Sequence, residues 1–164
     1  MEHRMKELHL DPELFADLVH ATSDALGIPA QLIEKDYYIS TVLRLLSMSA
    51  YAPQIVFKGG TSLSKAYQLI NRFSEDVDFA VTSEQMSGNQ VKTLLSHLMK
   101  EVTVGLVEDK EFPDISKGSK YRKQAFHYDA KIELDAITNP IPARIIVEIS
   151  AFANPFPNEK RVIE

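Results

Sequence analysis

A pair of glycines that follows a short apolar run constrains this chain more than any other feature. In the segment FKGGTSLSKAYQLINRFSEDVDFAV, residues 57–81, one lysine separates the pair from the apolar run Ile55–Phe57. Paired glycines break a strand and let the backbone turn tightly or approach a ligand closely. The same segment ends in Asp-Val-Asp and further apolar residues, so Asp76 and Asp78 begin a strand pattern. This order predicts a strand, a tight turn, a helix and a second strand.

The two aspartates predict a site for a hard cation. Residues i and i+2 of a strand point to the same face, so Asp76 and Asp78 share one face and the apolar residues share the other. Two carboxylates on one face repel each other, and a cation such as Mg²⁺, which prefers oxygen ligands, removes that repulsion. Asp-x-Asp is common by itself, and a solvent-exposed strand with two surface acids is the alternative interpretation.

The glycine turn predicts an anion-binding site. Backbone N–H groups at the start of a helix point at a bound phosphate. Ser62 and Lys65 are three residues apart and project from the same side of the predicted helix, which suits a triphosphate. The alternative is a tight strand–helix turn with an exposed lysine. The turn is not a Walker loop, because GxxxxGK[ST] is absent.

A third acid occurs in the apolar strand pattern RIIVEIS, residues 144–150. Glu148 shares a face with Ile146 and Ser150 there. A carboxylate inside so apolar a strand is costly to bury, so it requires either an exposed edge or a cationic partner. With the two aspartates it supplies the carboxylates that two-metal phosphoryl transfer requires.

The remaining periodicity predicts a mixed α/β sheet of a few strands with two leading helices. We expect a central strand at 55–57, an exposed strand or hairpin arm at 119–131 and a buried strand at 143–153. Helices are expected over the segments 11–27, 30–49, 61–71 and 83–106. The first helix is expected to bury the stripe Leu14, Leu18, Ala21 and Ala25, and the third the stripe Leu63, Ala66, Tyr67 and Ile70.

Several charged and aromatic residues have two interpretations. Glu34, Lys35 and Asp36 are expected to form a solvated helix face, although Lys35 is long enough to reach a bound nucleotide. His20 and His97 are expected on helix surfaces. The segment from Tyr121 to His127, with Arg122 and Lys123, is expected to be a solvated edge strand; the alternative is contact with a nucleic acid or a base.

Composition excludes several classes of protein. Cysteine is absent, so the chain forms no disulfide and no thiolate metal site. The formal net charge of −5 argues against a wholly basic nucleic-acid binder. No apolar run approaches the roughly 18 residues that span a bilayer, and no signal peptide is recognisable. We expect one cytoplasmic domain over residues 1–164, without membrane contact.

These motifs carry a resemblance to a known family. GGTSLSK, followed by RFSEDVD and later by VEIS, resembles the nucleotidyltransferase fold and, within it, the AbiEii/AbiGii toxin family. The superfamily pattern is a glycine turn, a helix, Asp-x-Asp and a third acid on a later strand. IEKDYYISTVLRLL also resembles the helix that precedes the turn in that family. The resemblance covers about residues 32–150.

The resemblance implies an α/β (α+β) nucleotidyltransferase fold of the polymerase beta-like kind, with a small mixed sheet flanked by helices. It implies Mg²⁺- or Mn²⁺-dependent transfer of an NMP from an NTP to a hydroxyl of tRNA, another RNA or a protein (EC 2.7.7 type). It also implies the toxin of a bacterial type IV toxin–antitoxin or phage-defence system, with a cognate antitoxin. The alternatives are a small-molecule nucleotidyltransferase of the antibiotic-modifying kind and a non-catalytic nucleotide-binding module.

By the same resemblance, Asp76, Asp78 and Glu148 are the catalytic metal ligands. The implied nucleotide-binding residues are Gly59, Gly60, Thr61, Ser62, Lys65, Arg72 and Ser74. Arg72 has the alternative of a helix C-terminal cation paired with Glu75. Family members carry a further C-terminal helical region, so base recognition and acceptor binding are expected either to be missing from this chain or to be supplied by residues outside it.

Overall fold

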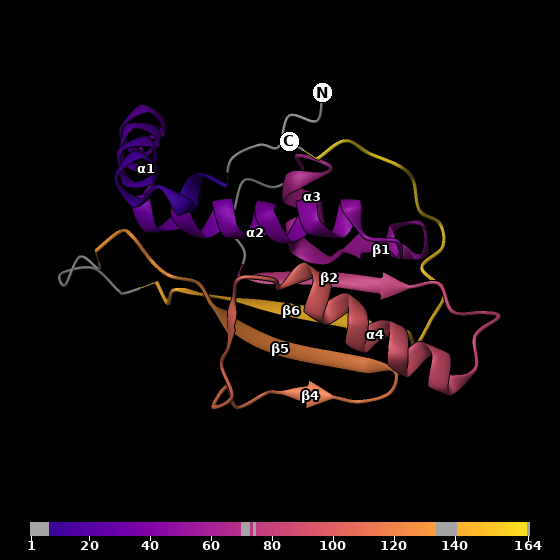
Figure 1. The fold of residues 1–164 in the computed structure, drawn as a ribbon. Helices are drawn as coiled ribbons and strands as arrows, with labels where there is room; N and C mark the ends of the chain where they lie inside the picture. Colours follow the sequence, from indigo (N-terminus) through magenta and orange to yellow (C-terminus); the bar gives the residue numbers. More distant parts are fainter. Residues whose placement is uncertain (1–6, 70–72, 74, 134–140, 164) are drawn as a thin grey trace, which may run out of the picture.

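The computed structural model describes residues 7–69, 73, 75–133 and 141–163. Two leading helices, α1 (Pro12–Leu26) and α2 (Ala30–Met48), precede a mixed sheet, as the sequence predicts. Asp11 caps α1 by accepting a hydrogen bond from the Leu14 N–H, and Gly27 ends it with φ 66°. Figure 1 shows α2 running along the sheet and α1 projecting beyond it. No helix in the described part of the chain is long and apolar enough to cross a membrane.

The sheet contains a parallel pair inside an otherwise antiparallel arrangement. Its order is β1-β2-β6-β5-β3, and β4 also pairs with β5. The strands β2 and β6 are parallel, and the other pairs are antiparallel. The strand bounds are Ile55–Lys58 (β1), Asp76–Val81 (β2), Val107–Glu108 (β3), Ser116–Lys117 (β4), Tyr121–His127 (β5) and Arg144–Ser150 (β6). Helix α3 (Gly59–Lys65) joins β1 toward β2, α4 (Gly88–Val102) follows β2, and two short 3-10 turns cover Leu8–Leu10 and Ala52–Gln54.

The main core lies between one face of this sheet and the helices α2 and α4. Val77 and Phe79 of β2 and Val147 and Ile149 of β6 are fully buried there. A capping box at Ser87 begins α4, whose apolar face completes the layer. A smaller cluster, formed by Phe112, Ala125, Ile146 and the partly buried Ile115, covers part of the opposite face. The sheet therefore has one largely apolar face, toward α2 and α4, and one face with room for polar groups.

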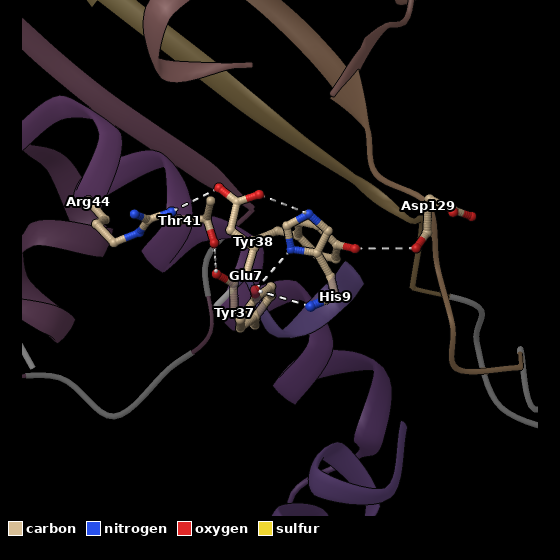
Figure 2. A network of polar contacts seen from close by, with 7 residues as sticks. All are labelled: Glu7, His9, Tyr37, Tyr38, Thr41, Arg44 and Asp129. Atoms are coloured by element: carbon tan, nitrogen blue, oxygen red, sulfur yellow. Dashed lines mark hydrogen bonds and ion pairs between the residues drawn. The ribbon is translucent and has the colours of Figure 1, made fainter. Parts of the chain in front are cut away.

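A polar network fixes the segment before α1 onto α2 (Figure 2). His9 Nδ1 lies 2.9 Å from the Tyr37 hydroxyl, and Glu7 Oε1 accepts a hydrogen bond from Arg44 NH2 at 3.3 Å. Tyr38 reaches across to the segment after β5, where its hydroxyl donates to the Asp129 carbonyl oxygen at 3.3 Å. Through these contacts α2 is anchored to both the N-terminal segment and the sheet.

Two strand expectations are wrong. The apolar run Ile55–Phe57 was expected to be central, but β1 lies at an edge of the sheet and its residues are only partly buried. The segment around Tyr121 was expected to be an exposed arm, but β5 is an interior strand that pairs with β6 on one side and with β3 and β4 on the other. Its burial is hidden in the sequence because Arg122 and Gln124, which are polar, face the protein interior.

The expected apolar stripes of two helices are also wrong. All four residues of the predicted α1 stripe (Leu14, Leu18, Ala21, Ala25) are exposed, and Phe15 and Val19 are buried instead. In α3, Leu63 is 42% exposed while Thr61 and Ser62 are buried. Helix α3 ends at Lys65, before Ala66 and Tyr67, and Ile70 lies outside the described residues. Each of these helices buries only a narrow stripe of side chains. A shift of one residue along the helix therefore changes which side chains reach the core.

The expected solvated face of α2 is wrong at its centre. Glu34 and Lys35 are each only 1% exposed, whereas Asp36 is partly buried. These charges are tolerated inside because each has a partner from another part of the chain, described below. His20 and His97 are exposed, as predicted.

Candidate active site

The three predicted acids lie on the polar face of two neighbouring strands. Asp76 and Asp78 alternate with the buried residues of β2, and Glu148 alternates with those of β6. In the parallel β2–β6 pair, Asp78 lies directly opposite Glu148 and Asp76 opposite Ile146. Paired residues of adjacent strands project to the same side of a sheet. The register therefore brings the three carboxylates to one face, although they come from distant parts of the sequence.

The glycine turn is packed directly against one of these acids. Gly59 has φ 77°, a conformation that side-chain-bearing residues rarely adopt. A Cβ atom added to Gly59 would lie 2.2 Å from Asp78 Oδ2, which is an impossible contact. The residue before it, Lys58, pairs with Asp78 in the β1–β2 register. The turn thus requires glycine for its backbone angle and for its close approach to the carboxylate.

The hydroxyl residues of α3 face inward. Thr61 and Ser62 are 3% and 5% exposed. The Thr61 hydroxyl donates a hydrogen bond to the Asp76 carbonyl oxygen, which ties α3 to the first residue of β2. Two contacts therefore join the turn and α3 to the acids: the Gly59 backbone packs against the Asp78 carboxylate, and the Thr61 hydroxyl bonds to the Asp76 backbone.

Lys65 lies at the end of α3 nearest to α2. Its Nζ atom donates hydrogen bonds to Asp36 Oδ2 at 2.8 Å and to the Ser40 hydroxyl at 3.0 Å. Its ammonium is thus held by α2 in this structure. The predicted phosphate ligands Arg72 and Ser74 lie outside the described residues.

Burial and neighbouring carboxylates raise the pKa of both aspartates. Burial is the main cause that raises the pKa of Asp76 and of Asp78, and the negative charge of Glu148 raises both further. Two lysines act in the opposite direction: Lys123 lowers the pKa of Asp76, and Lys58 lowers that of Asp78. Lys58 Nζ also lies 4.0 Å from Glu148 Oε1, so Glu148 has the cationic partner that its apolar strand requires. The site is a concentration of negative charge that two lysines compensate in part.

The family described as "Nucleotidyl transferase AbiEii toxin, Type IV TA system" matches residues 41–164. The chain belongs to the AbiEii family of nucleotidyltransferase toxins. Among solved structures, it is similar to MenT4, a nucleotidyltransferase toxin from Mycobacterium tuberculosis H37Rv, with a TM-score of 0.55 and 19% sequence identity. The match covers 91% of this chain and 48% of MenT4, so the chain spans about half the length of that protein. No curated protein matches the chain. The predicted family and nucleotidyltransferase fold are confirmed.

Beside the predicted acids lie residues that the sequence pattern did not assign to the site. Lys123 of β5 lies opposite Glu148 in the β5–β6 register, and Lys58 ends β1 beside Asp78. Burial, followed by the interaction with the Glu148 carboxylate, raises the pKa of Tyr121 to about 12. The alternation of Tyr121 and Lys123 was visible in the sequence. It acquires meaning only when β5 is known to pair with β6.

The donor set of the predicted site fits a hard divalent cation. All three candidate ligands are carboxylates, and their mutual repulsion is relieved by a cation placed between them. The raised pKa values of Asp76 and Asp78 record that repulsion together with their burial. Within the described residues, however, no three His, Asp or Glu side chains already converge as a finished metal cage. Metal binding would therefore have to draw the carboxylates of this face closer together.

A cavity of about 370 Å³ lies elsewhere in the AbiEii domain, between the 3-10 turn before β1 and the start of α4. Among the described residues its lining is Tyr51, Gln54, Met86, Asn89, Gln90, Thr93 and Leu94, none of which is an acid. The acids instead occupy an open face of the sheet. None of the predicted site residues lines the cavity.

Proposed function

We propose that residues 1–164 form the catalytic domain of a toxin that transfers an NMP from an NTP to a hydroxyl group, with Mg²⁺ as the metal. The observation that carries this proposal is the contact between the two halves of the site. The register places Asp78 opposite Glu148, and the Gly59 turn packs against Asp78. Phosphate-binding backbone and metal-binding carboxylates are thus adjacent, as phosphoryl transfer requires.

Each group has a role that follows from its position. Asp76, Asp78 and Glu148 would bind the metal, which polarises the phosphate oxygens and the attacking hydroxyl when bound. The backbone N–H groups of the turn at Gly59 and Gly60 would donate hydrogen bonds to the phosphates. The hydroxyl oxygen forms a bond to the α-phosphorus as the bond to pyrophosphate breaks, and the hydroxyl proton passes to a carboxylate of the site. The remaining predicted phosphate contacts are Thr61, Ser62, Lys65, Arg72 and Ser74.

The basic residues of the sheet would compensate the charge that gathers during transfer. Lys58 and Lys123 flank the acids from β1 and β5. A triphosphate brings several negative charges to a face that already carries three carboxylates. Cations on both sides of those carboxylates reduce the cost of bringing them together.

The acceptor would be the hydroxyl of a tRNA, of another RNA or of a protein side chain. As a toxin of a type IV toxin–antitoxin system, the protein would act in the cytoplasm, have a cognate antitoxin and take part in phage defence. A small-molecule acceptor of the antibiotic type is the alternative within the same chemistry. A non-catalytic nucleotide-binding module is the alternative outside it.

The test is a transfer assay with Mg²⁺, each α-labelled NTP and total bacterial RNA or protein. We expect label on a macromolecule and release of pyrophosphate by the wild type. Asp76→Ala should abolish both, because it removes a metal ligand. Transfer that survives this substitution would contradict the metal assignment. An NTP that binds without transfer to RNA, protein or an aminoglycoside would favour the non-catalytic module.

A further inference from the structure

Lys35 forms an ion pair with Glu75, the residue immediately before the strand that carries the predicted metal ligands. Lys35 belongs to α2, and its side chain is almost completely buried in the protein. Its Nζ atom lies 3.4 Å from Glu75 Oε1. Glu75 immediately precedes Asp76, and its carbonyl oxygen accepts a hydrogen bond from Ile146 N at 3.0 Å. Burying an ammonium is expensive, and a buried ion pair is often no more stabilising than apolar residues of the same volume. The ion pair of Lys35 is therefore not explained by fold stability. It is explained if its role is to fix the start of β2.

Asp36, the next residue of α2, contacts the other half of the site. Its carboxylate accepts the hydrogen bond from Lys65 at 2.8 Å, and Ser40, one turn further along α2, accepts a second one. Lys65 is the last residue of α3, the helix that begins at the Gly59 turn. Neighbouring residues of one rigid helix thus hold the end of α3 and the beginning of β2. A helix is stiff over this length, so it fixes the separation of whatever it holds.

Glu34 provides an internal comparison. It is as buried as Lys35, but its Oε1 atom accepts a hydrogen bond from the backbone N–H of Lys131 at 2.6 Å. Lys131 follows β5 and is remote in sequence from the acids and from the glycine turn. Burial raises the pKa of Glu34, so the ionised form of this carboxyl is also costly to bury. Its contact anchors a connecting segment and reaches neither half of the site.

We propose that Lys35 and Asp36 are positioning residues, which set the distance between the acid-bearing start of β2 and the ammonium of Lys65. The inference rests on the proposed function, since it assigns Asp76 to the metal and Lys65 to the triphosphate. Neither Lys35 nor Asp36 touches the reacting atoms. Lys35 acts through Glu75 on the metal ligands, and Asp36 acts through Lys65 on the nucleotide.

The Lys35 contact is tested by Mn²⁺ titration of the full chain, with free Mn²⁺ followed by electron paramagnetic resonance. Lys35→Met and Glu75→Gln should each weaken Mn²⁺ binding about tenfold, the loss typical when a group that orients a metal ligand is removed. The double variant should be no weaker than the weaker single variant, because both remove one contact. Glu75 is 45% exposed, so Glu75→Gln tests the contact without opening the core. Unchanged Mn²⁺ affinity in Glu75→Gln overturns the proposal.

The Asp36 contact is tested by NTP binding and by steady-state kinetics. Asp36→Asn keeps the shape but removes the charge that holds Lys65, so it should raise the KM for NTP about fivefold and change kcat less than twofold. A lower KM would show that Asp36 withholds Lys65 from the nucleotide, which contradicts the proposal. Glu34→Gln is the matched control, because glutamine can still accept the hydrogen bond from Lys131 N and should change neither Mn²⁺ affinity nor KM.

The readouts separate failure of this inference from failure of the proposed function. If the wild type binds Mn²⁺ and NTP but transfers nothing, the proposed function fails while the binding measurements still decide the roles of Lys35 and Asp36. If the wild type binds no Mn²⁺ at millimolar concentration, the positioning proposal is overturned as well. If Glu34→Gln weakens Mn²⁺ binding as much as Lys35→Met, the effect is general loosening of α2, and the proposal is also overturned.

Discussion

At the scale of single residues, the partly buried carboxylates of the site lower the stability of the folded protein. Asp78 is held between Glu148 on β6 and the Gly59 backbone, where burial and neighbouring carboxylates both disfavour its ionised form. Lys58 offsets only part of this cost. Such groups are typical of functional sites, where a raised pKa marks charges that are gathered for a ligand.

The sign of this effect predicts how Asp78→Asn changes stability. The pKa of Asp78 is raised above its ordinary value of 3.8, so the stability that the protonated group contributes is present at low pH and is lost as pH rises through the folded-state pKa. Without metal at pH 7, Asp78→Asn should therefore be more stable than the wild type. We expect Tm to rise by about 2–4 °C, the shift that about 1 kcal/mol produces in a domain of this size.

Scanning calorimetry in a chelator at pH 7 and at pH 4 checks this prediction. The difference between the two proteins should be smaller at pH 4, because the raised pKa makes wild-type Asp78 more protonated there than at pH 7. A loss of stability in Asp78→Asn at pH 7 would mean that the ionised carboxylate makes favourable contacts that outweigh its burial.

Gly59 allows a second prediction with a matched control. Both Gly59 and Gly27 have positive φ, at 77° and 66°, so alanine strains the backbone similarly at either position. A Cβ at Gly59 collides with Asp78 Oδ2, whereas at Gly27 nothing lies within 4 Å. Gly59→Ala should therefore abolish transfer, and Gly27→Ala should cost about 1 kcal/mol of stability and leave transfer intact. Transfer assays and urea denaturation distinguish the two, and equal activity losses would refute the contact argument.

At the scale of elements, the sequence predicts the alternation of side chains within a strand but not which strands pair in the sheet. The alternation in DVDFAV and RIIVEIS is enough to assign each acid to a face of its strand, because both strands have wholly apolar backs. Which strands are neighbours is a long-range property, so the edge position of β1 and the interior position of β5 did not follow from the sequence. The burial of Lys35 was missed for the same reason: its partner, Glu75, is on another element.

The pairing of β5 with β6 yields a prediction about pH. Lys123 lowers the pKa of Asp76, whose carboxylate, as a proposed metal ligand, would have to be ionised to bind the cation. Lys123→Met should therefore raise the pKa of Asp76 and shift the acid limb of the pH–rate profile to higher pH. Lys117→Met is the control, because it removes the same charge from β4, where Lys117 pairs with Glu108 at 2.6 Å. Profiles of kcat/KM for both variants check the prediction, and an equal shift in Lys117→Met would show a general charge effect.

At the scale of the whole molecule, the elements around the acid face are held from several sides. The polar network at His9 ties the N-terminal segment to α2, and α2 in turn holds β2 and α3 (Figure 2). After β6 the chain returns toward α3, as the yellow segment of Figure 1 shows, and the Arg161 guanidinium lies 4.2 Å from the centre of the Tyr67 ring. Ligand binding at the acids should therefore stabilise the fold as a whole.

This linkage gives the last prediction, which concerns thermal unfolding. A ligand that binds only the folded state at about 100 times its Kd adds about 2.7 kcal/mol, which for a domain of this size raises Tm by about 5–11 °C. We expect this rise with Mg²⁺ and NTP together in the wild type. Asp78→Asn should show little of it, although it starts from a higher Tm without ligand. The exposed Asp24 of α1 offers a control, since Asp24→Asn should respond as the wild type does. An equal rise in Asp78→Asn would mean that the nucleotide is held without metal at these acids, and the assignment of the carboxylates would have to be abandoned.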